Sequence, residues 1–277
     1  MAMENGWKST LSFRRFRRKL NELSMVHWTN QIGADSISKL IDGKDDSAYT
    51  VDEIGCSFDR RMFPRSVSET HHWLPVYMER TRLHLLVLTA ANLESFLQEV
   101  TFVHLAALGY VKRPDTLTQP LKLNAVGEAI GKPILGRASL PEPLRYAEQL
   151  FGIDYGAHRD TWTKAYKLRC IAAHTGGMVY SKHLVDIPDL ELNVFEMIGL
   201  DWDELLEAMR SADNIASQTD RFISSNDSRQ IEAEQTIRLM KAKGELPKKH
   251  KLWQAMHDLH GVQVNKASKL FLEEMFY

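Results

Sequence analysis

The feature that most constrains this chain is an apolar repeat between residues 76 and 108. Apolar side chains recur there at steps of three and four, from Leu83 through Leu93 to Ala107. This spacing places them on one face of a long α-helix. Gly109 lies just past the end of the repeat, where a residue with left-handed backbone favours termination. The sequence therefore predicts a mainly α fold.

Shorter helical patterns surround this repeat. They predict helices at 10–24, 143–151, 157–175, from 201 onward, at 228–242, and one or two short helices in 249–275 around Gly261. Asp201 and Glu204 have the spacing of a capping box, which marks a helix start. Pro247 is expected to separate the last two segments.

Three segments lack a clear helical period. Residues 26–75 contain breakers such as Gly43 and Pro64 and are expected to form loops with short helices. Residues 110–142 are rich in proline and glycine and are expected mostly to connect helices. Residues 178–198 alternate in a way that predicts a short β-hairpin, with Pro188 and Asp189 near its turn.

Composition excludes several classes of protein. With 44% hydrophobic residues the chain can offset the entropy of folding, so general disorder is excluded. Glu94 and Glu99 interrupt the longest apolar run, so no membrane span is expected, and no signal peptide fits. Cys56 and Cys170 are the only cysteines, which excludes a disulfide framework and a cysteine-rich zinc site. A cytoplasmic location is therefore expected.

Basic residues gather near both ends of the sequence. Residues 1–25 carry a net charge of +4 and residues 238–251 a net charge of +5, within a chain of net charge −1. Such segments either bind polyanions or are solvated helix faces. The first contains the candidate RNA-binding residues Arg14, Arg15, Arg17 and Arg18. The interleaved Phe13 and Phe16 either stack on RNA bases or pack inside the fold.

Residues 167–177 carry the clearest chemical motif. Arg169 offers a permanent charge and a fork of donors that suits a phosphate, and His174 can exchange a proton near neutral pH. Together these are the minimum for cleaving RNA through its own 2′-hydroxyl without a metal. Five residues turn a helix by about 500°, so the two side chains point about 140° apart. Either the helix end is irregular, or a second copy completes the site.

Other chemistries have weaker support. The sequence has no glycine-rich phosphate loop and no serine nucleophile elbow. His257 and His260 could ligate a metal together, but no third ligand is obvious, so no metal and no cofactor are expected. A thiol–imidazole pair of Cys170 and His174 is conceivable, at the i,i+4 spacing of a helix.

The Arg169-x4-His174 pattern resembles the R-x4–6-H motif of the HEPN superfamily, the higher eukaryote and prokaryote nucleotide-binding domains. The helix around residues 88–97, with Glu94 followed closely by Phe96, resembles the first core helix of that family. The similarity covers roughly residues 76–225. It implies a HEPN-like antiparallel helical bundle at 76–225, a basic helix and irregular extension at 1–75, and a basic helical extension at 226–277.

The resemblance also implies a function. Many HEPN proteins are metal-independent endoribonucleases that act as dimers, as toxins of toxin–antitoxin pairs or as abortive-infection effectors. Arg169 would hold the scissile phosphate and His174 would be the catalytic imidazole of a homodimer acting on tRNA or mRNA, with an antitoxin or sensor protein as a further partner. The residues expected to support them are Cys170, Glu94, Lys167 and Thr175, with Lys164 as a further RNA contact.

Two other interpretations remain open. Active members of the family usually have a polar residue after the arginine, most often asparagine, where this chain has Cys170. Cysteine is a weak donor, which favours a catalytically silent nucleotide-binding or dimerisation module. Alternatively the motif is accidental: Arg169 forms a surface salt bridge, His174 caps its own helix, and the basic ends hold nucleic acid.

Overall fold

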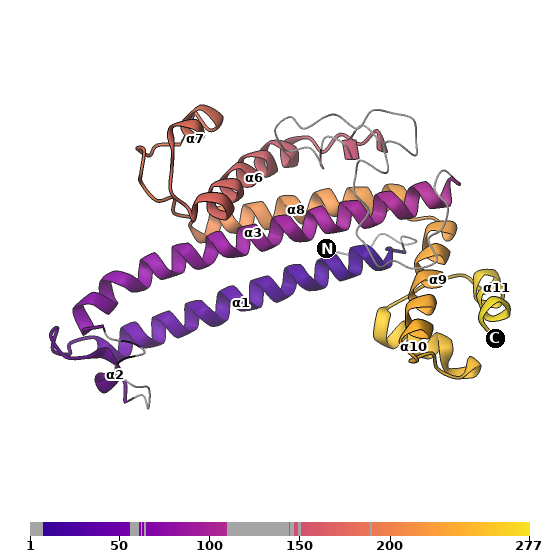
Figure 1. Ribbon diagram of the computed structural model, residues 1–277, viewed down its shortest axis with the longest axis horizontal. Helices are drawn as coiled ribbons and strands as arrows, with labels where there is room; N and C mark the ends of the chain where they lie inside the picture. Colours follow the sequence, from indigo (N-terminus) through magenta and orange to yellow (C-terminus); the bar gives the residue numbers. More distant parts are fainter. Residues whose placement is uncertain are drawn as a thin grey trace. The chain divides into compact units, whose positions relative to one another are not determined.

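The computed structural model describes residues 8–55, 61, 63, 65–109, 144, 147–148, 151–188 and 190–277. The expectations for Cys56, Pro64, Asp189 and residues 110–142 fall outside these ranges. Within the described residues the protein is mainly helical and has no β-strand, which confirms the mainly α prediction (Figure 1). The helices are α1 Leu11–Ile41, α2 Thr50–Glu53, α3 Val67–Ala107, α6 Ala157–Thr175, α7 Ser181–Asp186, α8 Trp202–Ile223, α9 Asn226–Ala242, α10 Leu252–His260 and α11 Lys266–Phe276.

The chain forms two compact units. Unit 1 comprises Met1–Lys19, Ala91–Thr163 and Ser211–Tyr277, and unit 2 comprises Leu20–Ala90 and Lys164–Arg210. Helices α1, α3, α6 and α8 each contribute residues to both units. The predicted division at residues 75 and 225 stays a prediction, because compactness alone does not define a family domain.

In unit 2, α3 runs back along α1 after the loop that holds α2 (Figure 1). Ala34 of α1 packs with Leu74 and Met78 of α3 in one apolar cluster. The Tyr77 hydroxyl donates to the Asn30 side chain at 2.9 Å on the same face. Burial of these apolar side chains contributes about 25 cal/mol per Å2 of surface removed from water.

Helix α1 is much longer than the 10–24 segment that the sequence predicted. A buried position recurs every seven residues, which is two helical turns, at Phe13, Leu20, His27, Ala34 and Ile41, and near the start of the helix Leu11, Ser12 and Phe16 are buried as well. The prediction of loops with short helices was wrong for residues 26–41. The apolar period was weak there because His27 and Ala34 occupy two of the buried positions. The ring of His27 is buried because it stacks on the ring of Trp202 of α8, with the two ring centroids 3.9 Å apart.

Helix α3 begins at Val67, before the predicted start at 76, and passes through Pro75. A capping box begins the helix: the Ser66 amide donates to Glu69 Oε2 at 2.9 Å, and the Glu69 amide donates to Ser66 Oγ at 3.2 Å. Thr70 is held by the hydroxyl of Thr50 at 2.7 Å. These contacts stabilise the turns ahead of a proline that by itself disfavours helix.

Unit 1 is built on a buried start of α1. Leu11 joins an apolar cluster with Ile237 of α9, Met256 of α10 and Leu272 of α11. The first amides of α1 have no partner within the helix, and two buried carboxylates accept from them. Asp220 Oδ1 accepts from the Thr10 amide at 3.1 Å, and Glu232 accepts from the amides of Leu11 at 2.7 Å and Ser12 at 3.0 Å.

The β-hairpin expected at 178–198 is not formed in the described residues. One antiparallel bridge joins Met178 to Met197, and α7 occupies part of the segment predicted to be extended. The helix forms because the His183 side chain accepts from the Tyr180 amide at 3.0 Å and so caps the first turn. Phe195, beside the bridge, has a positive φ of 73°, which is uncommon for a residue with a side chain.

The later helices agree with the sequence predictions. The capping box of α8 is present, with the Glu204 amide donating to Asp201 Oδ1 at 2.7 Å and the Asp201 amide donating to Glu204 Oε2 at 3.1 Å. Helix α9 ends at Ala242, and the left-handed Gly244 stops it before Pro247 is reached. Gly261, also left-handed, ends α10, and α11 follows it, so the segment 249–275 holds two short helices around Gly261 as expected.

Candidate functional site

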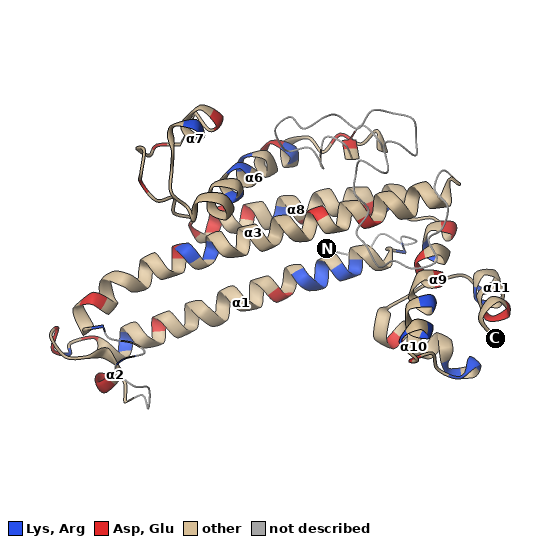
Figure 2. Cartoon of the chain, in the orientation of Figure 1, with Lys and Arg blue, Asp and Glu red and all other residues tan. Residues whose placement is uncertain are grey.

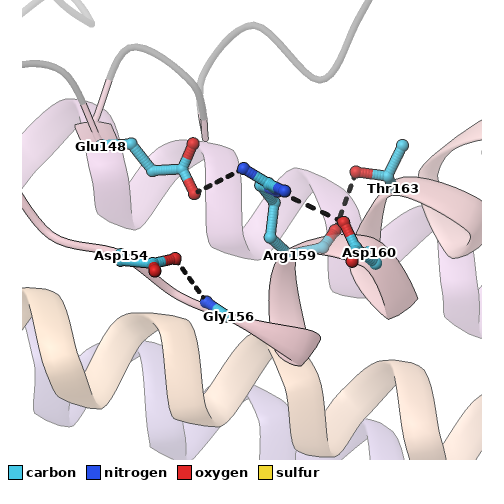
Figure 3. A network of polar contacts seen from close by, with 6 residues as sticks. All are labelled: Glu148, Asp154, Gly156, Arg159, Asp160 and Thr163. Carbon is cyan, nitrogen blue, oxygen red and sulfur yellow. Dashed lines mark hydrogen bonds and ion pairs between the residues drawn. The ribbon is translucent and has the colours of Figure 1, made fainter.

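The motif helix α6 begins in unit 1 with a polar network (Figure 3). Asp154 Oδ1 accepts from the Gly156 amide at 2.9 Å, which shapes the turn into the helix. Arg159 pairs with two carboxylates: its Nη1 lies 4.0 Å from Glu148 Oε1, and its Nε lies 3.3 Å from Asp160 Oδ1. Burial raises the pKa of Glu148, and the charge of Arg159 opposes that rise. These contacts surround the first turn of α6.

Arg169 is half-buried near the end of α6, in unit 2. Its guanidinium lies over the ring of Tyr166, 4.8 Å from the ring centroid, on the preceding turn. Such a cation–π contact restrains the side chain without neutralising its charge. Tyr166 was missed in the sequence analysis, although its i,i+3 spacing from Arg169 was the signal for this contact.

His174 is exposed in the last turn of α6. The helix remains regular through Thr175, whose hydroxyl lies 2.7 Å from the Ile171 carbonyl and 2.6 Å from the Met178 carbonyl. Gly176 and Gly177 then take positive φ values of 63° and 94° and end the helix. The first of the two sequence alternatives, an irregular helix end at His174, is therefore not found.

The regular helix keeps Arg169 and His174 apart in direction. Five helical residues correspond to about 500° of rotation, so the two side chains leave the helix about 140° apart. One copy of α6 thus presents a restrained arginine on one side and an exposed histidine on another. The arrangement can grip a phosphate and move a proton at the same place only if a second helix supplies the missing partner.

The predicted supporting residues are divided between the two units. Cys170 lies beside Arg169, with Sγ 4.0 Å from Nη1, and is partly buried. Lys167 Nζ donates to the Asp186 carbonyl at the end of α7, so it ties α7 to α6. Lys164 is exposed on α6 in unit 2, whereas Glu94 lies on α3 in unit 1.

The four N-terminal arginines lie on α1 in unit 1, where basic residues gather on the early turns of the helix (Figure 2). Their surroundings differ. Arg14 donates to Ser9 Oγ at 3.0 Å and to the Gly261 carbonyl, and burial lowers its pKa. Arg17 pairs with Asp213 at 3.2 Å. Arg18 is exposed and Arg15 is half-exposed. Arg14 and Arg17 are therefore engaged in holding unit 1 together.

The two phenylalanines between these arginines are buried. Phe13 and Phe16 are 4% and 2% exposed, and both rings contact Phe96 of α3. Rings packed in this way cannot stack on RNA bases. Of the two alternatives raised by the sequence, the structure has the packed helix with phenylalanine inside and arginine outside.

The histidines near the C-terminus do not form a metal centre in the part of the chain that the structure describes. His257 Nδ1 lies 3.1 Å from Asp258, next to it in the sequence. No group of three or more histidine, cysteine, aspartate or glutamate side chains that could hold a metal is found among the described residues. Likewise, none of the described helices combines the length and the apolar character that crossing a membrane requires.

Comparison of the chain with protein-family models, with curated proteins and with solved structures finds no match. The site must therefore be interpreted from its own residues. Those residues are a restrained arginine and an exposed histidine on one regular helix.

Proposed function

We propose that this protein is a metal-independent endoribonuclease of HEPN type that acts as a homodimer in the cytoplasm. The observation that carries the proposal is the geometry of α6. Arg169 is restrained against Tyr166 and His174 is exposed in the last turn, on a helix regular through both. A two-fold axis beside this helix would place the arginine of one copy opposite the histidine of the other.

The proposed reaction needs only these groups and the RNA itself. The 2′-hydroxyl oxygen attacks the adjacent phosphorus, and the bond from phosphorus to the 5′-oxygen breaks. The His174 imidazole accepts the proton of the 2′-hydroxyl, and the imidazolium so formed donates that proton to the leaving 5′-oxygen. Arg169 stabilises the charge that develops on the phosphate oxygens. The products are a 2′,3′-cyclic phosphate and a 5′-hydroxyl.

The resemblance also supports a biological role. Enzymes with this motif include toxins of toxin–antitoxin pairs and abortive-infection effectors. We therefore propose that this chain acts on tRNA or mRNA in phage defence or in a stress response. An antitoxin or a sensor protein would then hold it inactive until cleavage is needed.

Cleavage of RNA in EDTA tests the proposal directly. The parent protein should cut a tRNA pool and leave 2′,3′-cyclic phosphate ends, whereas His174→Ala and Arg169→Ala should each lose at least about a hundredfold in rate. His158→Ala, which removes a histidine from the same helix outside the motif, is the matched control and should cleave as the parent does. Equal cleavage by the parent and by His174→Ala would reject the assignment.

A second candidate function is favoured by Cys170. Its sulfur occupies the place beside the Arg169 guanidinium where the resemblance calls for a polar side chain. A thiol donates weakly, so the same fold could bind a nucleotide or a partner without cleaving RNA. Folded, dimeric protein that binds RNA but leaves it intact would favour this module. Cys170→Asn would then be expected to gain cleavage if the cysteine alone silences the site.

A further inference from the structure

The two basic ends of the sequence meet within unit 1. The Arg14 side chain, near the start of α1, donates to the carbonyl of Gly261, the residue that ends α10. A Cβ atom added at Gly261 would lie 3.0 Å from Arg14 Nη1, which shows how closely these segments pack. Residues almost 250 positions apart in the sequence are thereby held in contact.

The charges around His260, the last residue of α10, show what this contact brings together. Burial, followed by the charges of Arg15, Arg18 and Lys243, lowers the pKa of the half-buried His260 imidazole. Arg15 and Arg18 lie one turn apart on α1, and Lys243 is the residue that caps the end of α9. Glu245 opposes them. Because Arg14 contacts Gly261, the residue after His260, its neighbours Arg15 and Arg18 lie beside the end of α10, and the charge of Lys243 also acts on His260. We call this region the α1–α10 basic surface.

We propose that the α1–α10 basic surface, formed by Arg15, Arg18, Lys243 and His260, binds the phosphodiester backbone of RNA. It rests on the proposed function for the identity of the polyanion, and it lies in unit 1, whereas the motif residues lie in unit 2. Arginine presents a planar fork that suits phosphate oxygens, and lysine adds a point charge. Phe13 and Phe16 are buried, so the turns of α1 that carry Arg15 and Arg18 offer charge and no aromatic ring. We therefore expect this surface to recognise the backbone and not the bases.

This surface differs from the RNA-binding set that the sequence predicted. Arg14 and Arg17 drop out, because their guanidinium groups contact Gly261 and Asp213 within the fold. His260 is added because it adjoins Gly261, whose carbonyl accepts from Arg14 of α1, and Lys243 is added because its charge acts on His260. Lys241, Lys248 and Lys251 are exposed on the same C-terminal segment and add to its positive charge, whereas Lys249 pairs with Glu273 at 3.8 Å.

Binding of a fluorescent single-stranded 2′-O-methyl RNA, followed by anisotropy over a salt series, tests the inference. Each phosphate contact adds about 0.7 to the slope of log affinity against log salt. In a variant with Arg15→Gln, Arg18→Gln and Lys243→Gln, the slope of log affinity against log salt should be shallower by about 2. The affinity at low salt should fall at least about tenfold. A variant with Lys39→Gln, Arg80→Gln and Lys266→Gln removes three exposed charges elsewhere and should bind as the parent does.

The outcomes separate this inference from the proposed function. The 2′-O-methyl strand cannot be cleaved through its 2′-oxygen, and His174→Ala should bind it normally, so loss of catalysis does not affect the measurement. Unchanged binding by the Arg15, Arg18 and Lys243 variant would overturn the surface. Competition by poly-glutamate as strong as that by RNA would assign the surface to an acidic polypeptide instead.

An NMR titration of His260 locates the bound strand. A phosphate beside the imidazole stabilises its protonated form against Arg15, Arg18 and Lys243, so saturating RNA should raise the pKa of His260. The same titration of the protein without RNA gives the reference value for His260. An unmoved His260 in the presence of saturating RNA would place the strand elsewhere and overturn the inference.

Discussion

Glu232 shows how a single buried residue sets a property of unit 1. It accepts hydrogen bonds from the amides of Leu11 and Ser12 and from the Ser12 hydroxyl at 2.7 Å. A carboxylate suits this position because the start of a helix carries partial positive charge. Full burial nevertheless raises the pKa of Glu232 to about 7. Burial is the larger effect, and the folded protein therefore holds a proton here more firmly than the unfolded chain does.

This residue predicts a pH-dependent stability. Because the folded pKa lies above the ordinary value of 4.5, the stability that the proton contributes is complete below that value and is lost as the pH rises through about 7. The free energy of unfolding should fall by roughly 3 kcal/mol between pH 4.5 and pH 8 on account of Glu232. Urea denaturation followed by circular dichroism measures the change.

Two variants isolate this contribution. Glu232→Gln cannot ionise, so the decline attributable to this residue should vanish, although the variant is less stable at acid pH because an amide cannot accept every bond. Glu274→Gln changes an exposed glutamate of α11 and should keep the parental decline. An identical pH profile for Glu232→Gln and the parent would contradict the prediction.

At the scale of an element, α8 shows how a local signal fixes a helix start. Asp201 and Glu204 exchange hydrogen bonds with each other's amides at 2.7 Å and 3.1 Å, as their spacing predicted. The capping carboxylate satisfies an amide that has no partner within the helix. Because neither residue needs a distant partner, this start could be predicted without the tertiary structure.

The α8 cap predicts a modest and specific loss of stability. Asp201→Ala should lower the free energy of unfolding by about 1 kcal/mol, because the Glu204 amide loses its acceptor. Glu207→Ala, which removes an exposed glutamate one turn further along α8, should change it by less than about 0.5 kcal/mol. Chemical denaturation of both variants makes the comparison. Equal effects at the two positions would show that the cap contributes no more than surface charge.

The motif helix combines both kinds of information. The bounds predicted for α6, from about 157 to 175, agree with Ala157–Thr175, because apolar spacing and two following glycines are local signals. The contact of Arg169 with Tyr166 also lies within one turn of helix. In contrast, the role of Lys167 in holding α7 depends on a helix that the sequence predicted as extended.

At the scale of the whole molecule, the proposed enzyme requires two copies. If Arg169 of one copy serves His174 of the other, mixing the Arg169→Ala and His174→Ala variants should restore activity. Random exchange makes half of the dimers mixed, and each mixed dimer holds one complete site of two, so about a quarter of the parental RNA cleavage should return. Cleavage by the mixture is measured after exchange, with each variant alone as the control.

The opposite result is equally informative. A mixture as inactive as its two components, in protein shown by sedimentation to be dimeric and exchanged, would mean that both residues act within one copy. The 140° between their directions on a regular helix would then have to be closed by a rearrangement of the end of α6.

Much of the fold could be predicted from the sequence alone. The mainly helical content, the bounds of α6, the cap of α8 and the left-handed Gly109 all depend on residues within a turn or two of each other. Hydrophobic periodicity and caps are properties of neighbouring residues, and they act wherever the rest of the chain lies. The Arg169 and His174 pair was visible for the same reason.

The tertiary structure decided what depends on distant partners. Helix α1 continues to Ile41 because His27 is buried on Trp202, and it begins on carboxylates more than 200 residues away. The same separation hid the contact of Arg14 with the carbonyl of Gly261. An arginine in a sequence has the same charge whether it faces solvent, a carboxylate or a carbonyl. Only the packing of helices far apart in the sequence determines which of these it meets.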